Sequence, residues 1–378
     1  QARIRFNGVK IPKANLLHQE GRGLNVALTC LNYGRCTLSA GMVGAARFSL
    51  EQAGKWARNR FQFDRPLGEF ELVQKKLADM AAFVYAMDAM LYMTTGFLDR
   101  HDEDIMLETA ACKVFCSEWG YRTVNECLQI MGGESYMTEN RVERMWRDSR
   151  INTIVEGANE VMHSFIFAYG SKQLGEWMLS VKNNPTKNIG AGIKIASQLY
   201  LGVRPSAPQA DQCHPRARHH VEELMLRIRE FSHQVKLMFK EHEESLITNQ
   251  LVQERLSLAA LWLHATTCTL SRFDANLRNG LDGAALEHEA AVVEHLCAHA
   301  NSEFANALRS LRNNHDETIR KAGQSVLKWV DTLSNDGYSL PEMSPNVDAR
   351  GRDGHGFHAD QEQILQFGTG SAFTGDLV

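Results

Sequence analysis

The chain has 378 residues, which is enough for two or more domains of ordinary size. Apolar residues make up 44% and charged residues 23%, the composition of a soluble globular protein. The formal net charge is -4 and no basic stripe with interleaved aromatic residues occurs, which excludes a nucleic-acid-binding protein. The eight cysteines lack the paired spacing of a disulfide framework, which predicts reduced thiols in a reducing compartment.

The first residues, QARIRFNGVKIP, have the pattern of β-strands. Apolar and polar residues alternate over residues 4–7 and 9–11, on either side of an Asn7-Gly8 turn. A lone hairpin cannot bury an apolar face, so we expect these strands to pair with a further domain and the native polypeptide to begin upstream. The segment resembles neither a signal peptide nor a transit peptide, and no apolar run approaches the roughly 20 residues that cross a bilayer.

Residues 23–170 place apolar side chains mostly at helical spacing. Pro66 and Gly68 end a first helical stretch, and a second amphipathic stretch covers residues 72–91. After a charged turn, further helices are predicted at residues 105–131, 142–150 and 158–169. Long helices joined by short turns predict an antiparallel bundle.

The character of the chain changes after residue 170. Four of the eight prolines fall between residues 185 and 215, which predicts a connector whose one regular element is a short helix near residues 191–200. Helical periodicity resumes over residues 216–245, 250–278 and 284–334, with the polar stretch 313–316 as a candidate break. This predicts a second, smaller helical bundle, followed by a Gly- and Asp-rich tail that we expect to be extended or partly disordered.

The first motif that could carry chemistry is INTIVEGANEVMHSF, at residues 151–165. Apolar residues lead to Glu156 and Gly157, and a helix follows. The ordinary explanation is a glutamate stabilised by the helix dipole. The functional one is a general base whose pKa is raised by apolar surroundings, with a glycine that lets a ligand approach the backbone.

Two further motifs have a structural and a functional explanation each. In LQIMGGESYMTE, Gly132-Gly133 would either cap a helix or admit a flat or phosphate-bearing ligand. In RNRFQFDRPLGEFELVQKKLADM, Arg60 and Arg65 flank two phenylalanines in a turn between helices. These arginines would either be solvated or bind a pyrophosphate.

Metal sites and common nucleotide motifs find little support in the sequence. Cys112 and Cys116 stand one helical turn apart, as do His295 and His299, but neither pair has convergent third and fourth ligands. The Cys213-His214 and His219-His220 cluster gives no stronger signal. No nucleophile elbow, P-loop or dinucleotide fingerprint occurs, so no metal site is predicted.

Taken in order and spacing, the motifs resemble the C-terminal part of the acyl-CoA dehydrogenase family, and the long extension is similar to its very-long-chain subgroup. The resemblance runs from RIRFNGVKIPKANLL to about Gly170. It includes LNYGRCTLSAGMVGAARFSLEQAGKWARNRFQF, KLADM, LQIMGG, RVERMWRDSRI and EGANE. Residues 171–335 match only in helical character and position.

The resemblance implies a mainly α fold with a short β remnant at the N-terminus. The implied parts are the end of a central β-domain (1–20), the family's antiparallel helix bundle (21–175), a connector (176–215), a second helical domain (216–335) and an extended tail (336–378).

The same resemblance implies roles for individual residues. Glu156 stands where most of the family keeps its catalytic glutamate. Some members place that base on an earlier helix, but the corresponding residue here is Gly34, so this alternative is excluded by residue type. The implied acyl-CoA-binding residues are Asn32, Arg35 and Gly157. The residues implied to bind FAD are Arg60, Phe63, Gln129, Ile130, Met131, Gly132, Gly133, Ala158, Asn159 and Glu160, with Arg60 and Phe63 reaching the FAD of a neighbouring subunit.

Four positions depart from the family pattern. Ala158 replaces a threonine whose hydroxyl would contact the flavin, Asn32 stands where the family often has Asp, and Glu71 stands where many members have Gln. Asp64 replaces a glycine, and an acid near a pyrophosphate is unfavourable unless an arginine such as Arg65 neutralises it.

The activity implied is FAD-dependent α,β-dehydrogenation of a long-chain acyl-CoA to a trans-2-enoyl-CoA in fatty acid β-oxidation. Glu156 would take the α-proton, the flavin would take a hydride from the β-carbon, and electrons would pass to an electron-transferring flavoprotein. We further expect a homodimer or higher oligomer, peripheral membrane contact at most, and a mitochondrial matrix (eukaryotic) or cytoplasmic (bacterial) location. The alternatives are a dehydrogenase-like scaffold or assembly protein with weak or no catalysis, and an oxidase that uses oxygen directly.

Overall fold

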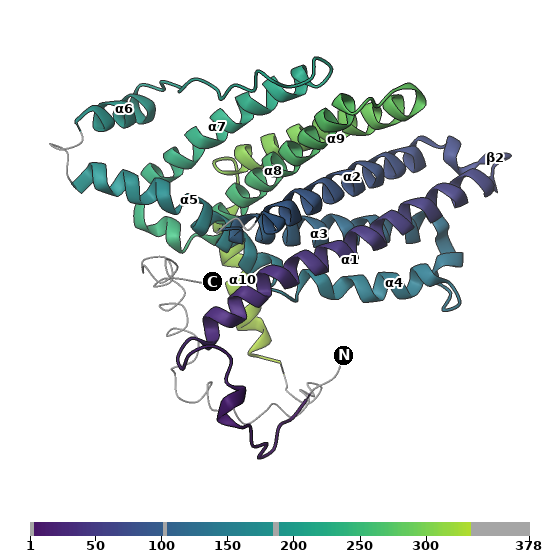
Figure 1. The fold of residues 1–378 in the computed structure, drawn as a ribbon, viewed down its shortest axis with the longest axis horizontal. Coiled ribbons are helices and arrows are strands. Elements are labelled where there is room, and N and C mark those ends of the chain that lie inside the picture. Colours follow the sequence, from purple (N-terminus) through teal and green to yellow (C-terminus); the bar gives the residue numbers. More distant parts are fainter. Residues whose placement is uncertain (1–3, 101–103, 184–188, 334–378) are drawn as a thin grey trace.

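A computed structural model describes residues 4–100, 104–183 and 189–333, and this part of the chain is built almost entirely of α-helices (Figure 1). The helices are α1 (Gly23–Asn59), α2 (Glu71–Asp99), α3 (Met106–Met131), α4 (Arg141–Ser149), α5 (Asn159–Asn183), α6 (Ile189–Tyr200), α7 (Arg218–His242), α8 (Gln250–Arg278), α9 (Gly283–Ser310) and α10 (Asp316–Val330). Short 3-10 turns are η1 (Lys13–Asn15), η2 (Leu67–Glu69), η3 (Gly132–Tyr136), η4 (Arg150–Thr153) and η5 (Glu243–Ile247).

The first three long helices run up, down and up. Asn32 near the start of α1 contacts Thr109 near the start of α3, and the ends of both helices share a hydrophobic cluster that includes Ala57 and Ile130. Helix α2 runs antiparallel to both: Met80, in its first half, lies in that same cluster, and Asp88, further along, pairs with Arg47 in the middle of α1. This arrangement confirms the predicted antiparallel packing of long helices.

The predicted second bundle shares a core with the first. One hydrophobic cluster contains Met87 of α2 and Phe115 of α3 together with Trp262 of α8 and Leu296 of α9. Asp88, buried in α2, also pairs with Arg272 of α8. Because apolar surface is removed from water between these helices, α8 and α9 stabilise α2 and α3 directly. The domain boundaries expected from the sequence remain a prediction.

Helix α2 is long and apolar enough to cross a membrane by length and composition alone. Its apolar side chains lie in the shared core, where Ala82, Ala86, Met87 and Met90 are fully buried. A core helix of a globular domain has the same composition, and this burial explains it.

Three local differences separate the structure from the sequence predictions. The strands predicted at residues 4–7 and 9–11 are not formed. Their apolar side chains, such as Phe6 at 78% exposure, have no neighbouring strand in the described part of the chain, and a strand needs a hydrogen-bonded partner. The small hairpin that is formed pairs β1 (Phe61–Gln62) with β2 (Arg65–Pro66). Helix α5 continues well past Tyr169, into the predicted connector. The predicted tail at residues 336–378 lies outside the described residues.

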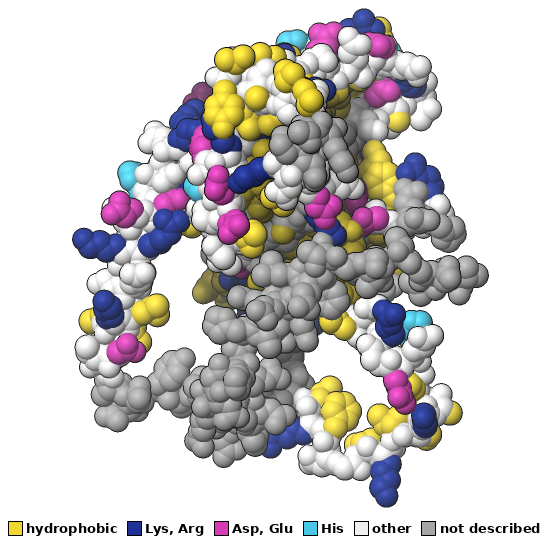
Figure 2. Space-filling view, turned by 90° about the vertical axis from the view of Figure 1, so that its left-hand side faces the viewer, with side chains coloured by type: hydrophobic (Ala, Val, Ile, Leu, Met, Phe, Trp, Pro, Cys, Tyr) yellow, Lys and Arg dark blue, Asp and Glu magenta, His cyan; other side chains and the backbone are white. Residues whose placement is uncertain are grey.

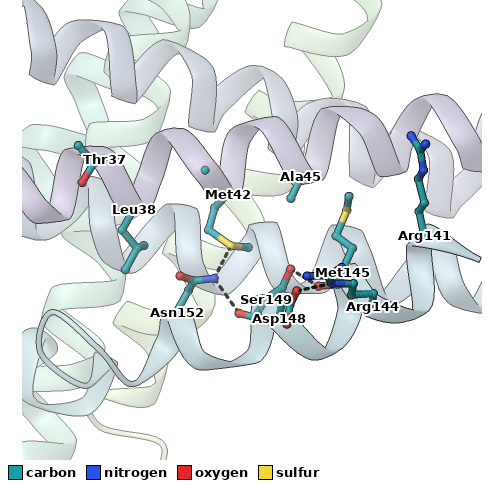
Figure 3. Close-up of a pocket in the computed structure, with 11 residues that line it drawn as sticks. Thr37, Leu38, Met42, Ala45, Arg141, Arg144, Met145, Asp148, Ser149 and Asn152 are labelled. Atoms are coloured by element: carbon teal, nitrogen blue, oxygen red, sulfur yellow. Dashed lines mark hydrogen bonds and ion pairs between the residues drawn. The ribbon is translucent and has the colours of Figure 1, made fainter. Parts of the chain in front are cut away.

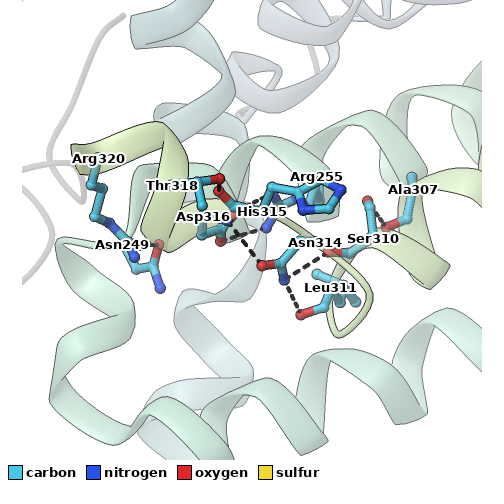
Figure 4. Close-up of polar contacts among 10 residues, drawn as sticks. All are labelled: Asn249, Arg255, Ala307, Ser310, Leu311, Asn314, His315, Asp316, Thr318 and Arg320. Carbon is cyan, nitrogen blue, oxygen red and sulfur yellow. Dashed lines mark hydrogen bonds and ion pairs between the residues drawn. The ribbon is translucent and has the colours of Figure 1, made fainter. Parts of the chain in front are cut away.

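Helix α10 confirms the predicted break at residues 313–316. Asn314 caps the helix start by accepting from the backbone N–H of Asp316, and Asp316 pairs with both terminal nitrogens of Arg255 on α8 (Figure 4). Because both partners of the ion pair are largely buried, it fixes α10 on the end of α8.

Helix α6 confirms the predicted short helix and lies at the edge of the molecule. Two lysines of α7 hold its C-terminal end: Lys236 donates to Gln198 at 2.9 Å, and the Lys240 ammonium lies 3.8 Å from the centre of the Tyr200 ring. Its outer apolar side chains, including Ile189 and Ile193, are more than 60% exposed. Figure 2 looks at the side of the molecule where α6 lies and shows hydrophobic side chains at the surface near the top of that side.

Candidate active site

The turn between η4 and α5 carries Glu156 and Gly157, both with left-handed backbone at φ 59° and 95°. This conformation is uncommon for a residue other than glycine and persists only where the surroundings fix it. The Arg35 Nε–H donates to the carbonyl of Glu156 at 3.4 Å, and the Lys113 ammonium donates to the carbonyl of Gly157 at 2.7 Å. The turn is therefore held from α1 and from α3.

The Glu156 carboxylate lies against Gly34 of α1. A Cβ built at residue 34 would stand 2.8 Å from Oε1 and 2.9 Å from Oε2 of Glu156, closer than such contacts occur. Oε2 is buried and has no hydrogen-bond partner among the described residues. A buried carboxylate oxygen without a donor is costly unless a ligand or proton meets it, so this group is available for chemistry.

Arg35 is a buried cation beside this carboxylate, with only 7% of the residue exposed. It donates to Asn32 Oδ1 at 3.2 Å, and its guanidinium lies 5.8 Å from the centre of the Phe165 ring. Burial lowers the pKa of Arg35, while the charge of Glu156 raises it. The two predicted substrate-binding residues on α1 are thus in mutual contact next to the predicted base.

Lys113 is a site residue that sequence reasoning missed. It is fully buried in α3, and its ammonium donates to the Gly157 carbonyl and to Asn159 Oδ1 at 2.8 Å. Burial lowers its pKa to about 8, and the nearby Arg35 cation acts in the same direction. The available sequence signal was the position of this lysine on a helical face. The same face carries Thr109, four residues before Lys113, and Gly120, seven residues after it, and both are buried.

Three predicted cofactor residues lie at the start of α5: Ala158 directly precedes the helix, and Asn159 and Glu160 are its first two residues. Ala158 is partly buried and Glu160 is exposed. Asn159, by contrast, is 6% exposed and faces the protein interior, where its Oδ1 accepts from Lys113 and, at 3.2 Å, from Ser117. Its Nδ2 is buried without a partner in the described part of the chain. The geometry supports a role in holding the turn, and a contact of Asn159 with the cofactor stays a prediction.

A second group of predicted residues lies at the far end of α1. Arg60 follows the last residue of that helix, roughly 39 Å from Gly34 along the helix axis. Phe63 and Asp64 form the tip of the β1–β2 hairpin with φ of 52° and 62°, and Phe63 is 86% exposed. The backbone at Asp64 is left-handed, which explains why the family pattern has glycine at that position. Aspartate adopts this backbone conformation more readily than most other residues do.

The predicted Gln129–Gly133 segment lies at the same end as Arg60. Ile130 and Met131 are buried in the cluster that joins the ends of α1 and α3, whereas Gln129, Gly132 and Gly133 are exposed. Gly132 ends α3 with φ 64°, and a Cβ on either glycine would meet nothing within 4 Å. The helix-capping role is therefore present, and the two glycines leave open space for a ligand.

A groove of about 420 Å³ runs between α1 and α4 (Figure 3). Thr37 lies at one end, one helical turn after Gly34, and Arg141 lies at the other. Met42 and Asn152 meet across it, where the Asn152 amide contacts the Met42 sulfur at 3.0 Å. No sequence pattern indicates this groove, because it depends on how α4 packs along α1.

The candidate metal residues do not form a site in the part of the chain that the structure covers. There, no three His, Cys, Asp or Glu side chains are grouped to hold a metal ion. Cys112 and Cys116 have their sulfur atoms 3.9 Å apart within the buried core. The His295 Nε2–H donates to the Asp79 carboxylate at 2.8 Å, which links α9 to α2.

Known families match two long parts of the chain. Residues 21–169 match "Acyl-CoA dehydrogenase, C-terminal domain", and residues 215–331 match "ACAD9/ACADV, C-terminal domain". The very long-chain specific acyl-CoA dehydrogenases of mitochondria from Mus musculus and Homo sapiens are 32% and 31% identical, over 84% and 83% of this chain. The alignments cover 49% and 48% of those relatives, so the chain spans about half of their length.

A solved structure gives the same result. The acyl-CoA dehydrogenase of Bacillus anthracis, complexed with FAD, is 25% identical with a TM-score of 0.65, over 84% of this chain and 55% of that one. The chain therefore belongs to the acyl-CoA dehydrogenase family, in the subgroup that resembles the very-long-chain enzymes. The fold class implied by the sequence is confirmed by this match.

Proposed function

We propose that the chain is the helical part of an FAD-dependent acyl-CoA dehydrogenase in which Glu156 removes the α-proton of an acyl thioester. The observation that carries the proposal is the Glu156 carboxylate over Gly34, with one buried oxygen that lacks a partner among the described residues. A general base must be held in place with a free lone pair facing the proton that it takes. Ile154 and Val155 precede it as partly exposed apolar side chains, which suits contact with an acyl chain.

The residues around Glu156 have complementary tasks in this proposal. Arg35 provides positive charge where negative charge would develop on the thioester, and Gly157 allows the thioester to lie close to the backbone. The backbone N–H of Glu156 is the proposed donor to the enolate oxygen. Since Lys113 is fully buried, it cannot touch the substrate and acts from behind the turn.

The residues present fit an FAD cofactor. The open Gly132–Gly133 turn and the exposed Arg60 and Phe63 are the features that a flavin dinucleotide would contact. Bound FAD would supply the electron sink that accepts a hydride from the β-carbon. The relative from Bacillus anthracis is an FAD complex, which supports the same cofactor here.

A homodimer is the proposed minimal assembly. The Glu156 group and the Arg60–Phe63 group lie roughly 39 Å apart along α1, a rigid helix. This separation supports a cofactor that is shared, with the two groups supplied by different subunits. Arg65, whose guanidinium lies 3.9 Å from the centre of the Phe70 ring, directly follows Asp64 in the chain and is the proposed cation that offsets its charge near a pyrophosphate.

The substrate class and partners complete the proposal. Names of the mammalian relatives favour a long acyl chain, and membership in the family favours an electron-transferring flavoprotein as acceptor. Eight free cysteines suit a reducing compartment, the mitochondrial matrix or a bacterial cytoplasm. The exposed apolar face of α6 is the proposed peripheral membrane contact. Liposome flotation of the protein with and without Ile193→Glu tests this, and equal flotation would reject the α6 contact.

A catalytically weak scaffold is the second candidate, favoured by Ala158 and Asp64. The test uses the native polypeptide that contains residues 1–378, purified and examined for a flavin spectrum. Acyl-CoAs of graded length are then added without oxygen. Bleaching of the flavin supports the dehydrogenase, and a flavin that no acyl-CoA reduces supports the scaffold. Peroxide formation in air at the rate of turnover would indicate an oxidase instead.

A further inference from the structure

A fully buried lysine in the middle of α3 needs an explanation. Lys113 has no exposed surface, although burying an ammonium is unfavourable unless strong acceptors replace its water. An apolar side chain of similar length, such as methionine, would fill the same space without that cost. The role of Lys113 therefore depends on which groups its ammonium binds.

The two acceptors of Lys113 lie at the start of α5. One is the carbonyl of Gly157, at 2.7 Å, and the other is Oδ1 of Asn159, the first residue of α5, at 2.8 Å. Ser117, one turn further along α3, donates to the same Oδ1. The ammonium thus connects the left-handed turn to the rigid middle of α3.

The other side of the turn is held less firmly. Arg35 reaches the Glu156 carbonyl at 3.4 Å, a long hydrogen bond, and divides its donors between Asn32 and the Met162 sulfur. Without Lys113, a residue with φ 59° and one with φ 95° would depend on that contact. Left-handed backbone at Glu156 is strained, so a loosened turn would relax and carry the carboxylate away from Gly34.

We infer that Lys113 is a positioning residue: it clamps the Glu156–Gly157 turn to α3 and so keeps the Glu156 carboxylate over Gly34. The inference rests on the proposed function only for its consequence in catalysis. The clamp itself is a property of the fold and can be measured without turnover.

The test compares Lys113→Met with Val124→Ala in the native polypeptide. Val124 is also fully buried in α3 but lies beyond the site, so its change perturbs core packing and leaves the turn alone. Hydrogen exchange of peptides that cover residues 153–160 is measured for both. We expect at least tenfold faster exchange in Lys113→Met and parent-like exchange in Val124→Ala. Equal exchange in the parent and Lys113→Met would overturn the clamp.

A milder variant guards against a protein that does not fold. The Lys113→Gln side chain is uncharged and shorter, so it can make only part of the hydrogen bonding of the lysine. We expect its exchange rate to lie between those of the parent and Lys113→Met. Where turnover is measurable, the Met variant should lose kcat at least tenfold with a smaller change in KM, because Asn32 and Arg35 lie on α1 and stay in place. Loss of thermal stability with parent kcat and parent exchange would show a purely structural lysine. Absence of turnover in the parent would count against the proposed function and leave the exchange result to decide the clamp.

Discussion

The Glu156 carboxylate occupies the space that a side chain at residue 34 would fill. A Cβ on Gly34 would lie 2.8 Å from Oε1 of Glu156, although 122 residues separate the two along the chain. The same glycine was the reason to exclude α1 as the source of the base. The structure adds that this glycine is also needed for Glu156 to take its place.

The first prediction concerns Gly34→Ala. Alanine is the better helix former by roughly 1 kcal/mol, so the fold should not be weakened. The added methyl should displace the carboxylate and slow flavin reduction by about 100-fold, the loss typical of a 1 Å misplacement. Stopped-flow reduction by acyl-CoA measures it.

Gly44→Ala on the same helix is the matched control, because a Cβ there meets nothing within 4 Å. It should gain helix stability and keep the parent rate of reduction. If Gly34→Ala also keeps that rate, the contact with Glu156 does not matter for catalysis.

The second prediction is that Glu156→Gln keeps the fold and the flavin but loses reduction by substrate. Glutamine has the same shape but cannot accept the α-proton, and general bases contribute about 100- to 10,000-fold. Anaerobic bleaching of the flavin is the measurement. Bleaching at the parent rate would show that another residue is the base.

The third prediction is that Arg60→Ala weakens FAD retention and, through it, the dimer. Losing a charge-assisted hydrogen bond to a pyrophosphate costs about 1.5–3 kcal/mol, which is tenfold or more in affinity. Flavin content after gel filtration at low protein concentration is compared with that of Arg58→Ala, an exposed arginine at the same helix end. Similar flavin content in both variants would mean that Arg60 makes no special contact.

The fourth prediction concerns acid stability. Burial lowers the pKa of His264 to about 4, and His264 lines a cavity of about 330 Å³ between α3, α5, α7 and α8. The unfolded chain takes up a proton near pH 6.5 while the folded chain stays neutral until about pH 4. The contribution of His264 to the free energy of unfolding is therefore fully present above about pH 6.5 and is lost as the pH falls from there towards 4.

His264→Gln should remove about 2 kcal/mol of the difference in unfolding free energy between pH 7.5 and pH 5. Urea unfolding at both pH values measures this difference, with exposed His315→Gln as the control. Burial also lowers the pKa of His163, His233 and His299, so part of the dependence should persist. An unchanged difference in His264→Gln would show that His264 is solvated in the folded protein.

The sequence by itself determined the helices and gave the reason to propose Glu156 as the base. Apolar periodicity gave most helix positions, because each long helix must bury one face whatever its neighbours are. Pro66 with Gly68 indicated one break between helices and the polar residues near 313–316 indicated a second, because these residues act on the local backbone. Motif order then placed Glu156, which no periodicity distinguishes from an ordinary helix-start glutamate.

Tertiary structure alone decided how those residues meet. The contact of Lys113 with Gly157 exists only because α3 packs behind the turn. The strands expected at residues 4–11 fail for the same reason, since a strand is stabilised by a partner and not by its own alternation. Local backbone preferences are encoded residue by residue, whereas buried charges and shared cores depend on contacts between segments that lie far apart in the chain.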